Sequence, residues 1–370
     1  MGRPMQMHNI TRQSIVGIMA AGNDANVLQK QIEYLANLIT AQGVAAVTCD
    51  PIISAESGFR AGAKMKKGDA DLVILFLGAG SLPGNIIQGI LACAAPVVLL
   101  DGTSCTESSA ALDVESVMRR CLKPPVGLID SMEDNREINA WCRVAAALRC
   151  VRGSVIGLLG SAPDALTARN CDPTTITRTF GIHIRMLEAC ALRALIVAAD
   201  GSITGGLEGL ITKYRLSGLA HHCTAAETHA CAVLAARGFP IADEADVRSC
   251  VALHIANALD LNPITVELGR KYENVICFNP SVEIKPGDAT IFSFGITSES
   301  AYWLTVAEGQ ILPYDTNQPL RFRPAEDAAQ FSRRWRAGAN GNRAIMLQTH
   351  RAELLIKWAD AMSIMVSTRA

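Results

Sequence analysis

The sequence predicts an α/β protein with two doubly wound parallel-sheet domains, followed by a smaller antiparallel β-rich C-terminal domain. Short β-branched or leucine-rich runs alternate with longer amphipathic stretches, and this alternation restarts in the middle of the chain. From about residue 281 the pattern changes to period-two alternation with frequent turn residues, which is typical of antiparallel strands. The predicted domains are therefore residues 1–152, 153–280 and 281–370.

The first predicted domain contains four strand-helix units in succession. Its first helix ends at Gly43, because glycine readily adopts the left-handed conformation that ends a helix. The predicted strands cover 14–22, 44–50, 71–80 and 96–102, and the predicted helices cover 26–43, about 55–68 and a segment that runs to about residue 94.

The second predicted domain follows a helix that ends over 146–153, and its first buried strand is SVIGLLGS. The predicted strands cover 154–161, 182–187, 216–223, 239–245 and 273–280, and the predicted helices cover about 173–180, 206–215, 225–238 and 247–260. Strand 273–280 is expected to close this second sheet. In the third domain, a final helix, RAELLIKWADAMSI, follows His350.

The composition excludes several classes of partner. The formal net charge is −1, so no global field attracts nucleic acid or an anionic membrane. No apolar run approaches the roughly 20 residues that span a bilayer. The twelve cysteines are scattered without a CxxC pair, which indicates reduced thiols. These features predict a soluble cytoplasmic protein with no nucleic-acid or membrane partner.

Two common kinds of site receive little support from the sequence. The glycine-rich turns FLGAGSLPG (76–84) and LLGSAPD (158–164) match neither a dinucleotide fingerprint nor a Walker A loop. They are more simply explained as tight strand-to-helix turns that line a cleft. Cys223 follows His221 and His222, but among twelve cysteines a chance His-Cys neighbour is expected.

Two acidic residues, Glu227 and Asp246, follow successive predicted strands. In an open parallel sheet both positions lie at the carboxyl edge, where acids from neighbouring strands bind ligands or a hard cation. The alternative is that Glu227 favours the first turn of a helix and that Asp246 is an N-cap. Composition alone favours this second interpretation.

A run of arginines marks the C-terminal region. Such a run is usually a solvated face or a subunit contact, although arginine also binds carboxylate, phosphate or sulfonate through its planar fork of donors. The arginines are residues 321, 323, 333, 334, 336, 343 and 351. We expect a subunit interface within 321–343.

The order of several motifs carries a family resemblance. The strand ADLVILFLGAG precedes APVVLLDG, and the segment GLLGSAPDALTARNCDPTTITRTFGIHIRMLEA contains a Gly-rich turn, Asp172, a helix ending in FG and a strand leading to Glu188. The segment LSGLAHHCTAAETHACAVLAARGFPIADEAD then places a Glu before a helix and an "IP" strand before an E-x-D. This order resembles the L-fucose isomerase and L-arabinose isomerase superfamily, especially its shorter fucose isomerase-like members.

The resemblance implies a role for each matched residue. Glu227 takes the place of a glutamate that is both metal ligand and proton shuttle, and Asp246 takes the place of an aspartate ligand of Mn²⁺ or Mg²⁺. The family also has an Asn-His pair followed by a second His seven residues on. In GNRAIMLQTHRAELL, Asn342 is kept and His350 matches the second His, but Arg343 stands where the metal-ligating His belongs.

Arg343 matters because a guanidinium stays protonated and cannot coordinate a cation. Three explanations remain open. His350 or a histidine within 221–229 supplies the third ligand, Arg343 pairs with an anionic group of the substrate, or the site is metal-free and repurposed.

The resemblance implies an aldose-ketose isomerase that moves a proton through an enediol on a small carbohydrate substrate, assisted by the metal. His222 and His350 are expected to line the cleft, and Arg343 to orient an anionic part of the substrate. The family builds its cleft between subunits, so a homo-oligomer, a trimer or hexamer, is also implied. The alternative is an isomerase-fold protein with an altered metal site that binds or converts an anionic carbohydrate derivative.

Overall fold

The computed structural model of the chain describes most of its N-terminal part and several separate segments of the remainder. The described residues fall into two compact units: the N-terminal unit contains those within Thr11–Cys150 and Ile356–Ser363, and the second unit contains those within Val151–Leu355 and from Ile364 onward. The division into three domains stays a prediction. The described ranges are 13–102, 109–159, 173–187, 241–242, 247–268, 275–277, 284–296, 302–313, 320–327, 329–331, 343–348 and 352–367.

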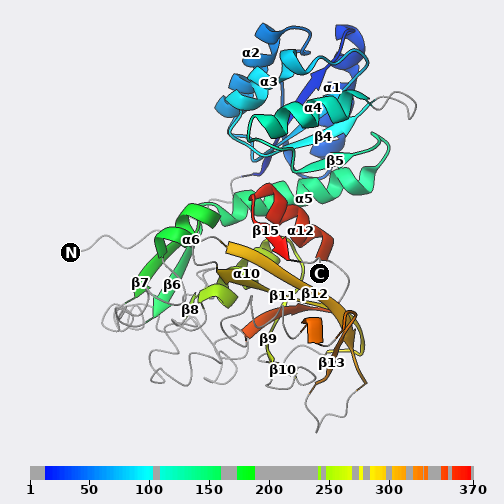
Figure 1. Cartoon of the computed structure of the whole chain (residues 1–370). Coiled ribbons are helices and arrows are strands. Elements are labelled where there is room, and N and C mark those ends of the chain that lie inside the picture. Colours follow the sequence, from blue (N-terminus) through cyan, green and yellow to red (C-terminus); the bar gives the residue numbers. More distant parts are fainter. Residues whose placement is uncertain are drawn as a thin grey trace, which may run out of the picture. The chain divides into compact units, whose positions relative to one another are not determined.

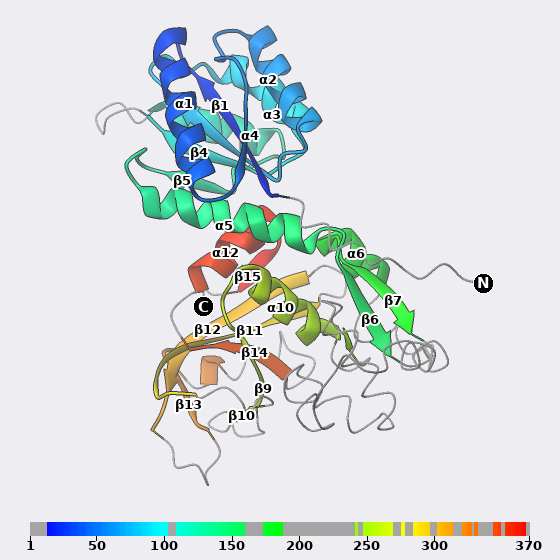
Figure 2. The same cartoon turned by 180° about the vertical axis from the view of Figure 1, so that it is seen from behind.

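The N-terminal unit is built on a parallel sheet of five strands in the order β2-β1-β3-β4-β5 (Figures 1 and 2). Every residue of the central strand β3 is buried, as expected for a parallel strand that is covered on both faces. The first four strands confirm the predicted ones, whereas the short β5 is an additional strand. The strands are β1 (Ile15–Ala21), β2 (Ala45–Thr48), β3 (Leu72–Leu77), β4 (Val97–Asp101) and β5 (Gly127–Ile129).

Helices pack on this sheet from both sides. Buried residues of α2, α3 and α4 share one apolar cluster with strand residues such as Met19, Leu75 and Leu99. The buried stripe of α1 lies outside that cluster, and α1 contacts β1 and β2, so it covers the opposite face (Figures 1 and 2). The described helices are α1 (Ala25–Ala41), α2 (Ala55–Lys67), α3 (Pro83–Ala92), α4 (Ser109–Arg120) and α5 (Asn135–Val151).

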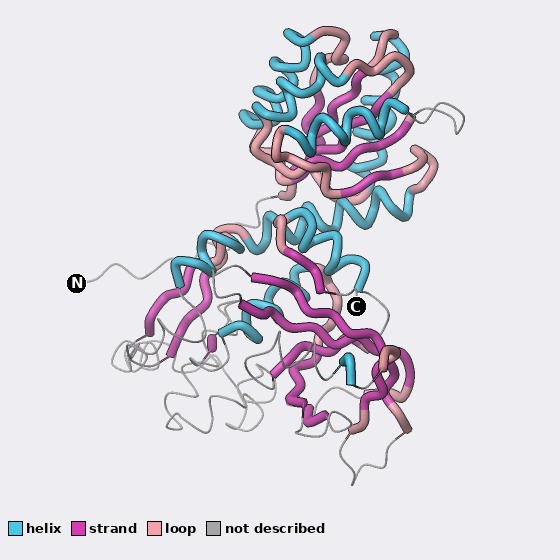
Figure 3. Tube along the Cα trace, viewed as in Figure 1, coloured by secondary structure: helices cyan, strands magenta, loops and turns pink. Residues whose placement is uncertain are grey.

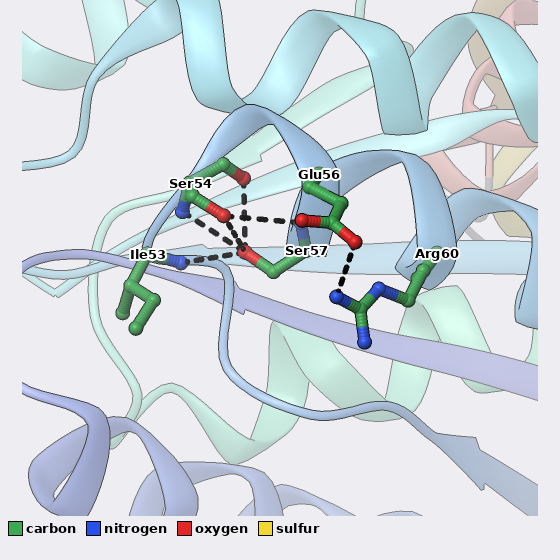
Figure 4. Close-up of polar contacts among 5 residues, drawn as sticks. All are labelled: Ile53, Ser54, Glu56, Ser57 and Arg60. Carbon is green, nitrogen blue, oxygen red and sulfur yellow. Dashed lines mark hydrogen bonds and ion pairs between the residues drawn. The ribbon is translucent and has the colours of Figure 1, made fainter.

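The local sequence explains where α2 begins (Figure 4). The Ser54 hydroxyl accepts a hydrogen bond from the Ser57 backbone N–H at 3.2 Å, and the Ser57 hydroxyl accepts one from the Ser54 N–H at 2.9 Å. This reciprocal pair is a capping box, which satisfies two backbone donors that the helix leaves free. The neighbouring Glu56–Arg60 pair, at 2.6 Å, is exposed on both sides and adds little stability.

Close contact between α2 and α3 depends on glycine. A Cβ atom built at Gly58 would lie 1.9 Å from the Asn85 carbonyl oxygen, and one built at Gly62 would lie 2.0 Å from the Gly89 carbonyl oxygen. These are backbone atoms, which cannot rotate away as a side chain can. The two helix backbones can therefore lie this close together only without side chains at these positions.

A segment from the end of the chain completes the N-terminal unit. Helix α12 (Ala352–Ala361) confirms the predicted final helix. Its Lys357 forms an ion pair with Glu137 of α5, and the Lys357 ammonium lies 5.1 Å from the centre of the Trp141 ring. The Trp141 indole N–H donates to the same Glu137 oxygen, Oε1, at 3.2 Å. These contacts attach the returning segment to α5.

The second unit contains a three-stranded parallel sheet in the order β7-β6-β8 (Figure 3). Strand β6 (Val155–Leu159) leads toward helix α6 (Pro173–Phe180), which is followed by β7 (His183–Leu187); β8 (Ile241–Ala242) lies on the other side of β6. These elements confirm the predicted strands 154–161 and 182–187 and the predicted helix near 173–180.

The other described sheet of the second unit is antiparallel, in the order β10-β9-β14-β11-β12-β13, with β15 added to β12 by parallel pairing. This confirms the antiparallel C-terminal region. One expectation was wrong: β10 does not close the parallel sheet but pairs antiparallel with β9. The strands are β9 (Ile264–Leu268), β10 (Val275–Cys277), β11 (Gly287–Ile296), β12 (Tyr302–Ile311), β13 (Phe322–Pro324), β14 (Arg343–Leu347) and β15 (Met365–Ser367).

Helix α10 (Val247–Ala258) contacts both sheets of the second unit, β6 and β8 of the parallel sheet and β9, β11 and β14 of the antiparallel sheet. One face of the antiparallel sheet packs into a cluster that includes Ile291 and Met346 but no described residue of α10. Alternate strand residues point to opposite faces. Helix α10 therefore packs on the other face, which carries Thr290, Phe292 and Phe294.

Candidate functional site

Of the five residues that the sequence singles out, four lie outside the described residues: His222, Glu227, Asp246 and His350. The fifth, Arg343, is the first residue of strand β14. Whether the Glu227 and Asp246 carboxylates meet stays a prediction.

The structure describes the elements that precede and follow Asp246 in sequence, strand β8 and helix α10. Strands β6, β7 and β8 are parallel, and their carboxyl ends, at Leu159, Leu187 and Ala242, lie at one edge of the sheet. Ligands in parallel α/β sheets bind at this edge. In sequence, Asp246 stands between the end of β8 and Val247, the first residue of α10.

Arg343 has a defined backbone position. Its strand lies between β9 and β11, and the antiparallel register places Arg343 opposite Glu267 of β9. The position that the family resemblance reserves for a metal-binding histidine is therefore a strand position near the middle of the antiparallel sheet. Of the other predicted arginines, Arg321 and Arg323 are exposed on either side of the buried Phe322.

The carboxyl edge of the five-stranded sheet is a second place where a ligand could bind, because the strand order reverses between β1 and β3. At this edge, the loop after β1 and the loop after β3 form hydrogen bonds with each other. The Gly78 N–H donates to the Ala21 carbonyl at 2.8 Å, and the Asn23 N–H donates to the Ala79 carbonyl at 3.0 Å. The buried Ser81 hydroxyl lies 2.8 and 2.7 Å from the Ala21 and Gly78 carbonyl oxygens, which share its single hydrogen.

These hydrogen bonds use backbone donors that a phosphate would otherwise need at the 76–84 turn. The backbone donors at Asn23 and Gly78 that a nucleotide-binding loop would present are already used inside the protein. The structure agrees with the interpretation of this turn as a tight strand-to-helix connection. The second glycine-rich turn, at 158–164, lies mostly outside the described residues.

The buried cysteines of the N-terminal unit are poor nucleophiles. Burial raises the pKa of the Cys49 thiol to about 12 and that of the Cys142 thiol to about 11. A thiol with so high a pKa carries almost no thiolate at neutral pH, and the thiolate is the reactive form. The Cys223 candidate, with His221 and His222, lies outside the described residues.

Charged groups of the N-terminal unit serve structural purposes. Arg149 donates to Asp71 at 2.8 Å and to Asp69 at 2.6 Å, and Asp71 also accepts from the Ile15 N–H at 2.9 Å. Burial alone would lower the pKa of Arg149, but the bonds to Asp69 and Asp71 raise it above its ordinary value. This cluster ties α5 to the turn before β3.

Lys123 has a similar structural purpose. Its ammonium group donates to the Ile90 carbonyl at 2.6 Å and also to the Cys93 carbonyl. Both carbonyls lie at the carboxyl end of α3. Burial lowers the pKa of Lys123. A cation at this position satisfies helix carbonyls and interacts favourably with the helix dipole.

Two polar atoms of the second unit are buried in a different setting. The Nε2 atom of His254 on α10 and the hydroxyl of Thr290 on β11 have no hydrogen-bond partner within the described part of the chain. Burial lowers the pKa of His254, so its imidazole is neutral near neutral pH. A neutral imidazole can donate through one nitrogen and accept through the other.

Neither residue was singled out from the sequence. A histidine inside the apolar helix VRSCVALHIANA was the available signal for His254, and Thr290 lies in an ordinary alternating strand pattern. Within the described residues, no group of three or more His, Cys, Asp and Glu side chains is arranged to hold a metal ion. No described helix combines the length and apolar character needed to cross a membrane.

Comparison with known proteins adds no relative. No protein-family model matches the chain, and no curated protein shows significant sequence similarity to it.

Proposed function

We propose that the protein is a sugar isomerase-like enzyme that interconverts an aldose and a ketose. The observation that carries the proposal is the motif order in which Glu227 and Asp246 follow successive predicted strands and Arg343 comes later. The parallel β7-β6-β8 sheet, with Asp246 between β8 and α10 in sequence, supports it. The antiparallel sheet in the C-terminal region also agrees with the domain order that the resemblance implies.

In this proposal the carboxylates do the proton chemistry. Glu227 removes the proton from C2 of the open-chain sugar and returns it to C1, while a second proton moves between the two oxygens through the enediol. Asp246 holds the site's second negative charge. The donor set of two carboxylates suits Mn²⁺ or Mg²⁺, which when bound would polarise the carbonyl and the neighbouring hydroxyl.

Arg343 favours a second candidate function. Its fixed positive charge repels a cation and binds a carboxylate, phosphate or sulfonate. A protein with this residue at the motif position would bind or convert an anionic carbohydrate derivative. Glu227 and Asp246 would then act as acid and base or as hydrogen-bond acceptors.

Metal content and proton exchange test the leading proposal. The purified protein would be assayed for bound Mn²⁺ or Mg²⁺, and then incubated in D₂O with L-fucose, L-arabinose and other aldoses while NMR follows the C2 proton. We expect exchange that Glu227→Gln and Asp246→Asn each reduce at least 100-fold, consistent with the loss of a general base or a ligand. Asp243→Asn, a neighbouring acid outside the matched positions, is the control and should keep exchange.

The substitution Arg343→His separates the two candidates. If the site is a metal isomerase with an incomplete ligand set, the new imidazole should tighten Mn²⁺ binding. If Arg343 binds an anionic substrate, the same change should weaken the thermal shift caused by a sugar acid or sugar phosphate. Absence of both metal and exchange in the wild-type protein over the whole panel would rule out the isomerase proposal.

A further inference from the structure

The register of the antiparallel sheet pairs two residues of opposite charge. Arg343, the first residue of β14, is directly opposite Glu267 of β9. Neither strand is at an edge of the described sheet, because β9 lies between β10 and β14, and β14 lies between β9 and β11. In such a pair the two Cβ atoms are about 4.5–5.5 Å apart, and opposite charges stabilise the pairing. The backbone therefore brings a carboxylate residue to the position that the family resemblance reserves for a metal-binding histidine.

The two charged residues belong to the same face of the sheet. Their strand neighbours Ala344 and Val266 are members of the apolar cluster on one face. Because successive residues of a strand alternate between faces, Arg343 and Glu267 belong to the other face. The next residue of β14 on that face, Ile345, is fully buried. A single charge is costly beside apolar surface, and an opposite charge at the paired position reduces that cost.

This face of the sheet contacts the part of the second unit that contains the parallel sheet. The register of β11 with β14, continued by two residues beyond its last pair, places Phe294 beside Arg343. The Phe294 ring lies 5.0 Å from the ring of Phe180, the last residue of α6, which follows β6 in sequence. Helix α10 begins directly after Asp246 in sequence and contacts β9 and β14 as well as β6 and β8. The charged pair is therefore on strands that contact the helix next to Asp246.

We propose that Glu267 neutralises the charge of Arg343, so that the proposed site accepts a neutral sugar and a divalent cation in preference to an anionic sugar derivative. The inference rests on the proposed function, because it takes Arg343 to be at the reaction site. A guanidinium without an opposite charge would repel Mn²⁺ or Mg²⁺ and attract a carboxylate or phosphate. With Glu267 at the paired position, the net charge of the two residues is zero. Glu267 thus determines which ligands bind, and it acts through Arg343.

The first test asks whether the two residues form a pair, and it needs no ligand. Glu267→Arg places two like charges at opposite positions, so the melting temperature of the full-length protein should fall. Adding Arg343→Glu exchanges the two charges and should restore most of the loss. Asp288→Asn is the control, because Asp288 accepts a hydrogen bond at 3.1 Å from the neutral Gln310 opposite it on β12. Adding Arg343→Glu to this control should recover nothing. An exchanged pair that is no more stable than Glu267→Arg would overturn the inference.

The second test measures the charge preference of the site. Isothermal titration calorimetry at low salt would follow the binding of Mn²⁺, of D-gluconate as an anionic probe and of L-fucose as a neutral probe. Glu267→Gln keeps the size of the side chain and leaves Arg343 without a compensating charge. Mn²⁺ should then bind roughly tenfold more weakly and D-gluconate roughly tenfold more tightly, the effect of a unit charge about 10 Å away at an effective dielectric constant of about 20. L-fucose affinity should stay the same, and 1 M salt should reduce both shifts.

The direction of the two shifts decides the outcome. Arg343→Gln should shift both affinities in the opposite directions to Glu267→Gln, and the double variant should be close to the wild type. Asp288→Asn should leave both affinities unchanged. If Glu267 had only a structural role, its loss would change both affinities in the same direction or change neither, and either result would overturn the inference.

The exchange of the C2 proton separates this inference from the proposed function. Opposite shifts without exchange would reject the isomerase and retain the neutralised pair. Exchange that Glu227→Gln abolishes, with neither affinity dependent on Glu267, would support the isomerase and overturn the neutralisation. If the wild type and all variants bind none of the three probes, both are overturned.

Discussion

In the N-terminal unit the buried Asp71 carboxylate accepts hydrogen bonds from Arg149 and from the Ile15 backbone, whereas in the second unit the buried Nε2 of His254 has no hydrogen-bond partner within the described residues. Hydroxyl groups give a second comparison. The single hydrogen of the Ser81 hydroxyl is shared between two carbonyls at the edge of the five-stranded sheet, whereas the Thr290 hydroxyl on β11 has no hydrogen-bond partner in the described part of the chain. Asp71 and Ser81 hold elements of the first unit together.

This difference indicates where to look for function. A sequence that specifies its fold satisfies its buried polar groups, and departures from that rule tend to occur at binding or catalytic sites. The loops after β1 and β3, at the switch point of the five-stranded sheet, are hydrogen-bonded to each other. The polar groups at that edge therefore have a structural role. Among the described residues of the second unit, the Nε2 atom of His254 and the hydroxyl of Thr290 retain unused hydrogen-bonding capacity. Removing the Asp71 carboxylate and removing the Thr290 hydroxyl should therefore change the stability of the protein in opposite directions.

The largest effect is expected from Asp71→Ala. The Asp71 side chain is 3% exposed, and its loss leaves the 13% exposed Arg149 guanidinium and the Ile15 N–H short of an acceptor. Removing one partner of a buried pair costs about 3–5 kcal/mol because the other charge remains buried. Urea denaturation of the full-length protein would measure the loss, and hydrogen exchange should show it in the N-terminal unit.

An exposed ion pair provides the matched control for this prediction. Glu56 and Arg60 form a contact of 2.6 Å, slightly shorter than the 2.8 Å between Arg149 and Asp71, but their side chains are 76% and 70% exposed. Glu56→Ala should change the free energy of unfolding by less than about 1 kcal/mol. If Asp71→Ala were as mild as Glu56→Ala, the cluster at Arg149 would not be holding the N-terminal unit together.

A somewhat smaller effect is expected from Gly62→Ala. The new Cβ would lie 2.0 Å from the Gly89 carbonyl oxygen, so α2 and α3 must move apart, at a cost of about 1–3 kcal/mol. The same substitution at Gly84 of α3 meets nothing within 4 Å and should be neutral or stabilising by up to about 1 kcal/mol. Opposite signs in denaturation of the two variants would establish that close backbone packing, and not helix propensity, decides the result.

Lys357→Met tests whether the returning C-terminal segment belongs energetically to the N-terminal unit. The change leaves Glu137, whose side chain is 19% exposed, without its cation while the Trp141 indole still donates to it. We expect a loss of about 1–2 kcal/mol, since the pair is only partly screened by water. Faster hydrogen exchange in α5 would confirm the coupling. A change confined to 352–363 would contradict it.

Much of the fold follows from sequence periodicity, as the N-terminal unit illustrates. Strand β3 is a continuous apolar run, and the helices between strands have caps that can be read directly, such as Ser54 with Ser57. Strand β5 was missed because it has three residues and no pattern of its own. Strand β10 was placed in the wrong sheet because a short apolar run does not reveal its pairing partner, which is set by tertiary contacts.

The candidate site was less accessible to the same reasoning. Glu227 and Asp246 were identified from motif order. Motif order describes the sequence alone, so the positions of the two residues are needed to tell whether their carboxylates meet. His254 and Thr290 have no sequence signature, because whether a buried nitrogen or hydroxyl has a partner depends on tertiary packing. Periodicity predicts that a residue is buried, but not whether its polar atom is satisfied.

The smallest expected effect concerns pH and the second unit alone. Burial lowers the pKa of His254 below its ordinary value of 6.5, so between the folded and unfolded pKa values the unfolded chain binds more protons than the folded one. Stability is therefore full above pH 6.5 and falls as the pH decreases through the folded pKa. His254→Gln should flatten this dependence in urea denaturation at a series of pH values, with hydrogen exchange of α10 as the local readout.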